Sequence, residues 1–293
     1  MAFNNKSSAE RFLFTCYSFV PEHGKIGTDP GMDVGDEVWY YSDNSADYSN
    51  KTTFWIAKGM QNSNEPLVDY WNGTQWGKAM FVGIRDCNVF IENIEKVPDL
   101  SAYDKETWKA EAKVLKAFYH FWMMRMYGPI PIIKENIPVS AGEDEVRVVR
   151  DKIDDIVTYI VSLIDESVEY LPLNIQNEAA EMGRITRPAA KAIKAKILAF
   201  AASPFFNGNL DYANFKNAEG EPFFNQVYDN EKWTKAADAC LEAIQCAEEA
   251  GHGLYEFVNM SSTQLSDETI LSLSNRCKVT ERWNKELVWG CGQ

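Results

Sequence analysis

Apolar side chains recur with a helical period along most of the chain, most strongly between Trp108 and Tyr127. There they alternate at steps of four and three residues, which places them on one face of a helix. The last turns are apolar nearly all round, so we predict a central helix that other elements cover on several sides. It should begin after Ser101 and end before Gly128-Pro129, a pair that stops helices. The main stripe consists of Trp108, Ala112, Leu115, Tyr119, Trp122 and Met126.

The same period predicts helices elsewhere in the chain, and strand signals are almost absent. The Ala-rich faces of two of these helices favour close packing, as in stacked helical hairpins. Residues 286–289 are the exception, because they read as a short buried strand. We therefore predict an all-α fold built from helix pairs. The predicted helices cover residues 7–20, 80–98, 146–171, 189–202 and 233–250, with a helix end near 267–274.

Long polar and aromatic segments separate some of these helices, at residues 21–76 and 205–230. Structureless segments of this length in compact domains are often functional, and exposed Trp and Tyr side chains mark binding surfaces. Trp71 is preferred over Trp76, because Trp76 opens a helix and core packing is the commoner role there. The predicted ligand contacts are Trp71, Asn72 and Trp76, followed by Asp36, Trp39, Tyr40, Tyr41 and Asp43.

Composition narrows the class of ligand. The net charge of −14 disfavours nucleic acid and anionic lipid, and an uncharged ligand fits this balance better. The six cysteines and three histidines show no metal-ligand spacing, and His120 is predicted to be a core histidine. No cofactor is predicted, and nothing in the sequence supports calcium. No run of about 18 apolar residues suggests a membrane span.

Four separated stretches together resemble the SusD/RagB family, the outer-membrane nutrient-binding lipoproteins of Bacteroidetes. Residues 76–94 are similar to a family helix, with Phe81 where Tyr is usual and one extra residue of spacing. Residues 111–133 look like the family's signature that ends in Y-G-x-V-P-L-I. Residues 183–208 look like its GR-T block ending in S-P-L-F-N-G, and residues 232–239 resemble its W-x-K-A-A-D-A-A helix.

The resemblance implies a superhelix of tetratricopeptide-like helix pairs, here a single domain over residues 1–293 with inserted loops. It implies a C-terminal half that is expected to be missing from this chain. A lipidated N-terminal cysteine is also absent, because Cys16 lies in an amphipathic segment. The implied function is to capture a glycan or oligosaccharide at the outer surface of the outer membrane, without cleaving it. The ligand would pass to a SusC-like TonB-dependent transporter.

Two other classes of function stay open. A glycoside hydrolase needs two carboxyl groups about 5 to 9.5 Å apart across the scissile bond, and adjacent acids such as Asp36 and Glu37 rarely converge in that way. A helical-repeat adaptor that binds other proteins agrees with the helix pairs. The long aromatic loops and the lack of a repeating consensus argue against the adaptor.

Overall fold

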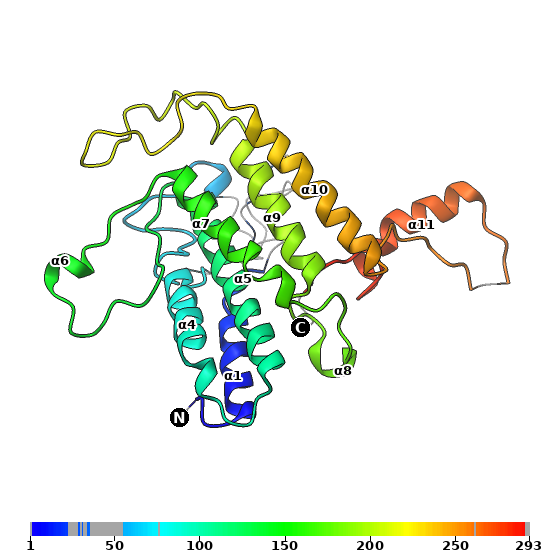
Figure 1. Ribbon diagram of the computed structural model, residues 1–293. Coiled ribbons are helices and arrows are strands. Elements are labelled where there is room, and N and C mark those ends of the chain that lie inside the picture. The colour runs from blue at the N-terminus through cyan, green and yellow to red at the C-terminus, as the bar shows by residue number, and fades with distance from the viewer. Residues whose placement is uncertain are drawn as a thin grey trace. The chain divides into compact units, whose positions relative to one another are not determined.

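The computed structural model describes residues 2–22, 29, 31, 34–35, 55–75, 77–260 and 262–290. These residues are mostly helical, and their only β-pairings are isolated bridges (Figure 1). The predicted all-α class is therefore confirmed. The chain divides into two compact units, residues 1–100 with 115–150 and residues 101–114 with 151–293. The single domain over residues 1–293 stays a prediction.

The first unit contains α1 (Lys6–Tyr17) and α4 (Met80–Asn93), which pack together, and the 3₁₀ turn η2 (Ile94–Lys96). Phe12 on α1 lies over Phe90 on α4, with ring centroids 6.3 Å apart. The helix predicted from residue 7 begins one residue earlier, at Lys6, because Asn5 caps it. The side chain of Asn5 accepts a hydrogen bond of 2.9 Å from the backbone N–H of Ser8.

Helix α5 (Ala102–Tyr127) is the predicted central helix, and both units contain part of it. Its ends follow the local signals. The hydroxyl of Ser101 accepts from the N–H of Asp104 at 3.0 Å, and Gly128 adopts a φ of +71° after the last turn. Most of the predicted stripe is buried, including Tyr119 and Trp122. The prediction of this helix is confirmed.

His120 on α5 is fully buried and both of its ring nitrogens have backbone partners. Nδ1 lies 2.8 Å from the carbonyl of Lys116, and Nε2 accepts from the N–H of Ile133 at 3.2 Å. Burial lowers the pKa of His120 to about 4, so the ring is neutral at physiological pH. The prediction of a core histidine is confirmed.

The second unit contains the Ala-rich pair α9 (Arg187–Ala202) and α10 (Glu231–Glu249), which lie side by side (Figure 1). Ala195 on α9 is buried with Ala239 and Ala243 on α10, so small side chains let the two helices approach closely, as predicted. The hydroxyl of Thr186 caps α9 by accepting from Ala189. The remaining helices of this unit are α7 (Ile153–Asp165), η3 (Val168–Tyr170), α8 (Glu178–Glu181) and α11 (Asp267–Thr280).

Two predicted elements are wrong. The helix predicted from residue 146 begins only at Ile153, and the short helix α6 (Glu143–Val146) precedes it. Val148 and Val149 are exposed, so there is no apolar face at this point for a longer helix to bury. Residues 286–289 form turns instead of a strand. Individual hydrogen bonds hold them in place. One of these is donated by the indole N–H of Trp289 to the carbonyl of Gly183 at 3.0 Å.

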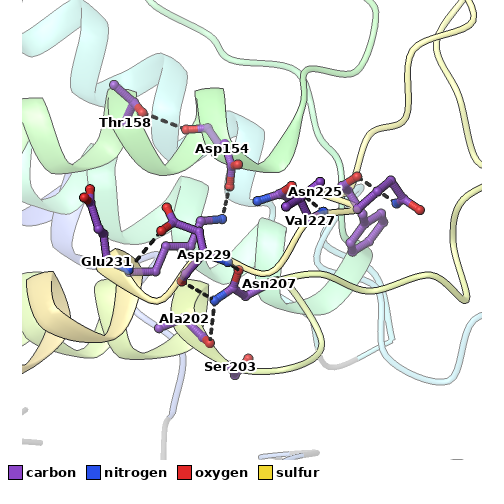
Figure 2. Close-up of polar contacts among 12 residues, drawn as sticks. Asp154, Thr158, Ala202, Ser203, Asn207, Asn225, Val227, Asp229 and Glu231 are labelled. Carbon is purple, nitrogen blue, oxygen red and sulfur yellow. Dashed lines mark hydrogen bonds and ion pairs between the residues drawn. The ribbon is translucent and has the colours of Figure 1, made fainter.

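The long loop at residues 203–230 joins α9 to α10 and closes on itself at its base, as Figure 2 shows. The amide of the buried residue Asn207 accepts from the N–H of Asp229 at 2.8 Å and donates to the carbonyl of Asp229 at 2.8 Å. Farther out, the rings of Tyr212 and Phe224 stack with centroids 4.8 Å apart. Its aromatic residues therefore pack largely against each other.

Candidate functional site

The loop at residues 61–79, in the first unit, presents the preferred sequence candidate, Trp71. A single carboxylate organises it. Asp69 is 5% exposed and accepts four hydrogen bonds from the residues that follow it. Its Oδ1 accepts from the N–H groups of Trp71 and Asn72 at 2.9 and 3.0 Å, and its Oδ2 accepts from the side chains of Asn72 and Thr74 at 3.1 and 2.9 Å. This is the Asx-turn chemistry that Asp favours, and it fixes the tip of the loop.

Two glycines allow the loop to fold this tightly. Gly73 adopts a φ of +79°, which side chains other than glycine rarely accept. At Gly77 a Cβ atom would lie 1.8 Å from the carbonyl oxygen of Asp69, so no larger residue fits there without moving the backbone. The loop is therefore a narrow clasp around Asp69, closed by an antiparallel bridge between Asp69 and Thr74.

Trp71 is half-buried and its indole contacts three side chains from other parts of the first unit. The rings of Phe81 and Tyr127 meet it edge-on, with centroids 4.8 and 5.6 Å away. The guanidinium of Arg150 lies over the indole, 5.4 Å from its centroid. Such cation–π contacts hold a ring in place and leave a charged group beside it. Trp71, which the sequence predicts to contact a ligand, thus uses part of its ring for packing within the protein.

Asn72 and Arg150 are exposed next to the half-buried indole. The side chain of Arg150 is held in place by a second contact, because its guanidinium donates to the carbonyl of Pro129. The flat apolar ring and the amide of the loop, with the guanidinium of Arg150 beside them, form a surface for a ligand with one apolar face and a polar rim. Nothing in this arrangement resembles an acid–base pair.

The pKa values of three groups in and beside the loop are shifted from their ordinary values. Burial alone would raise the pKa of Asp69, but the hydrogen bonds from Asn72, Thr74 and Trp71 outweigh it and lower that pKa below its ordinary value of 3.8. Burial raises the pKa of Tyr70 to about 12 and that of Tyr127 above its ordinary value. The hydroxyl of Tyr127 accepts from the N–H of Tyr70 at 2.8 Å, so it also supports the loop.

The structure places only part of the predicted site. Trp71 and Asn72 lie together on the clasp. Trp76, Asp36, Trp39, Tyr40, Tyr41 and Asp43 lie outside the described residues.

Asp69 and Arg150 were not predicted as site residues. The sequence signal for Asp69 is the Asp-x-x-Asn-Gly-Thr pattern of residues 69–74, which is typical of an Asx-turn. Arg150 gave no such signal, because the fold brings it to Trp71 from a distant part of the chain.

Among the residues that the structure describes, no group of three or more His, Cys, Asp or Glu side chains is placed to hold a metal ion. The cysteines in that part of the chain are free thiols: Cys16, Cys87, Cys240, Cys246 and Cys277. In the same part, no helix combines the length and the apolar character that crossing a bilayer requires.

Comparisons with known proteins agree with the fold. A family model described as "SusD-like_3: Starch-binding associating with outer membrane" matches residues 26–198, more than half of the chain. A SusD-like protein of Bacteroides ovatus is 31% identical over 99 residues, which cover 34% of this chain and 16% of that protein.

Solved structures extend the match to nearly the whole chain. The protein BT4246 shares 29% identity at a TM-score of 0.77, over 99% of this chain and 51% of its own. A laminarin-binding SusD-like protein shares 18% identity at a TM-score of 0.61, over 98% of this chain and 51% of its own, which shows a common fold. The chain thus spans about half the length of these solved relatives. The predicted tetratricopeptide-like helix pairs are confirmed, and the chain belongs to the SusD-like family, whose model description links starch binding with the outer membrane.

Proposed function

We propose that this protein binds an oligosaccharide without cleaving it, and that the clasp around Asp69 carries one of the contacts. The observation that supports the proposal is the half-buried indole of Trp71 beside the exposed Asn72 and Arg150. The family description and the laminarin-binding relative name carbohydrates as ligands of similar proteins. The clasp has the chemistry that such a ligand requires.

Sugars present apolar C–H faces and rims of hydroxyl groups. The faces stack on indole rings, and the hydroxyls pair with amides and guanidinium groups. Because Asp69 and the glycines fix the backbone of the clasp, Trp71 and Asn72 lose little freedom on binding. Preorganisation of this kind favours affinity, because less conformational entropy is lost. The acidic net charge of −14 favours a neutral glycan over an anionic one.

Titration calorimetry against a panel of neutral oligosaccharides tests the clasp. The variant Trp71→Leu keeps an apolar side chain against Phe81 and Tyr127 but removes the aromatic face. We expect at least a tenfold loss of affinity, about 1.4 kcal/mol of binding free energy. Unchanged affinity in a folded Trp71→Leu protein would remove the clasp from the binding site.

A matched control uses a tryptophan that does not belong to the clasp. Trp233 on α10 is 42% exposed, and Trp233→Leu should leave the affinity unchanged. The release of reducing ends from any of the oligosaccharides would contradict the non-catalytic part of the proposal. This assay needs no variant.

The second part of the proposal concerns the destination of the ligand. Delivery to a SusC-like TonB-dependent transporter at the outer surface of the outer membrane, with the binder held by a lipid anchor, follows from the family resemblance. Its support is the outer-membrane association in the family description. Purification of the protein from its native membrane should recover such a transporter. Recovery of a soluble partner alone would favour the helical-repeat adaptor.

A further inference from the structure

The second unit contains a cavity of about 350 Å³ that the clasp does not use. Its lining comes from the segment that precedes α9, from the turn after α10, and from residues 283–290. Ligand pockets in proteins usually span about 300 to 1,000 Å³, so this cavity has the size for a small ligand. All of its lining residues belong to one unit, so it exists within that unit by itself.

Hydrogen bonds hold the wall formed by residues 283–290 in place at both ends. At one end, the carbonyl of Lys285 accepts from the N–H of Gly253 at 3.1 Å and lies 3.1 Å from Nδ1 of His252. At the other end, the indole N–H of Trp289 donates to the carbonyl of Gly183 at 3.0 Å. The cavity is therefore formed before any ligand arrives.

Trp283 lines the cavity with an unusual backbone. Its φ is +54°, a left-handed conformation that bulky side chains rarely adopt. The neighbouring Asn284 holds this turn, because its amide donates to the carbonyls of Lys278 and Glu281 at 2.8 Å each and accepts from the N–H of Glu286 at 3.0 Å. Backbone strain of this kind gathers at ligand sites. Here the strained residue, Trp283, carries one of the two indoles that line the cavity, and Trp289 supplies the other.

The charges around the cavity nearly cancel. Arg184 is buried and its guanidinium is engaged by two carboxylates, in a paired contact with Glu111 at 2.7 and 3.1 Å and a single contact with Glu181 at 3.0 Å. The other charged side chains that are exposed in the lining are Glu178, which is negative, and Lys285, which is positive. An anionic ligand would therefore gain little from this site. Two indoles with amide, carboxylate and ammonium groups suit a neutral polyol.

We propose that this cavity is a second saccharide site, for a neutral mono- or disaccharide or the end of a longer neutral glycan. Trp283 and Trp289 supply the apolar surface, and Asn174, Glu178 and Lys285 supply the polar rim. The assignment of a sugar to this cavity rests on the proposed function. Its lining shares no residue with the clasp, so the two sites can be tested separately.

Proton–nitrogen correlation NMR on the whole chain tests the proposal, because each tryptophan indole gives its own signal. The probes are maltose, cellobiose and laminaribiose, with digalacturonate as the anionic comparison. We expect at least one neutral disaccharide to shift the indole signals of Trp283 and Trp289 in a saturable way, and digalacturonate to shift neither. If no neutral disaccharide moves these two signals, or digalacturonate moves them as strongly, the proposal is wrong.

Two variants assign the signals and test the site. Trp283→Asn removes the ring but tolerates the left-handed backbone, and we expect at least a tenfold loss of disaccharide affinity. Trp289→Phe keeps a ring and loses the hydrogen bond to Gly183, so a smaller loss is expected. Trp233→Leu is the control for loss of a tryptophan elsewhere in the same unit. Affinity that stays unchanged in Trp283→Asn would overturn the proposal.

The clasp variant separates this proposal from the proposed function. If the Trp283 and Trp289 signals still shift in Trp71→Leu, the cavity binds independently of the clasp. If Trp71→Leu abolishes glycan binding and those two signals never shift, the proposed function stands and the second site does not exist. If no saccharide binds anywhere on the chain, both proposals fail.

Discussion

Two loops of this protein, residues 61–79 and residues 203–230, are each fixed by one buried polar side chain, but the two side chains differ in charge. In the first loop the carboxylate of Asp69 accepts four hydrogen bonds and donates none. In the second, the neutral amide of Asn207 both donates and accepts. A charged acceptor forms stronger hydrogen bonds, but it also responds to pH.

The aromatic residues of the two loops are used differently as well. In the first loop the indole of Trp71 packs against side chains from outside the loop and remains partly exposed. In the second loop Tyr212 and Phe224 stack on each other. A stretch rich in aromatic residues is thus no evidence of a ligand surface by itself. Exposure does not separate the two loops either, because Tyr212 is 39% exposed; what distinguishes Trp71 is the exposed guanidinium of Arg150 over its ring.

The largest expected effect comes from removing the carboxylate of the first loop. Asp69→Ala leaves the N–H groups of Trp71 and Asn72 without their acceptor, and hydrogen bonds to charged groups contribute about 1.5 to 3 kcal/mol. We expect the free energy of unfolding to fall by about 3 kcal/mol, measured by urea denaturation. Asp211→Ala, at an exposed carboxylate in the second loop, is the control and should change it by less than about 0.5 kcal/mol.

A smaller loss is expected from the second loop. Asn207→Ala removes two short hydrogen bonds between neutral groups, to the N–H and the carbonyl of Asp229. Each contributes about 1 kcal/mol, so we expect a loss of about 2 kcal/mol by the same measurement. If Asn207→Ala costs as much as Asp69→Ala, the charge of the buried side chain is not what distinguishes the two loops.

The smallest expected effect is a pH dependence of the first loop, which needs no substitution. Because hydrogen bonding lowers the pKa of Asp69, its stabilising effect is complete above about pH 4 and is lost as the pH falls through the lowered value. Asn207 does not titrate. Amide hydrogen exchange should therefore show the loop at residues 61–79 opening on acidification, while the N–H of Asp229, from which Asn207 accepts a hydrogen bond, keeps its protection.

The control for this experiment is Asp69→Asn, in which the protection of the first loop, relative to the intrinsic exchange rate at each pH, should not fall over the range in which the Asp69 carboxylate would protonate. It is needed because His120 takes up a proton in the same acidification. Burial lowers the pKa of His120 to about 4, so its contribution to stability is present above about pH 6.5 and is lost towards pH 4. Equal acid sensitivity of the first loop in the wild type and in Asp69→Asn would contradict the role of the carboxylate.

Sequence was sufficient wherever a local signal decides the structure. The hydroxyls of Ser101 and Thr186 and the conformation of Gly128 mark helix ends in the chain itself, and the structure has them in those roles. Alanine content likewise predicted the close contact of α9 and α10. These effects act within one helical turn or one helix pair, so a linear pattern carries them.

Sequence failed where distant residues decide the outcome. The valines at residues 146–149 have a helical spacing, but no surface covers them, and the helix begins only at Ile153. Arg150 reaches Trp71 across 79 positions of the chain, a contact that no periodicity predicts. The strand predicted at residues 286–289 lacked a partner strand, and its turns line a cavity instead.

For protein engineering, the geometry of the clasp separates positions that can be substituted from positions, such as Gly77, that cannot. Gly73 and Gly77 accept no larger side chain without strain or movement of the backbone, whereas Asn72 and Thr74 have exposed side chains. A library that varies only these exposed positions would sample new ligand preferences on an unchanged scaffold. Asn72 and Thr74 would each need to keep a side chain that donates a hydrogen bond, because both donate to Asp69. On the proposed function, ligand preference at this loop would thus be encoded in very few codons, and selection could change it without refolding the protein.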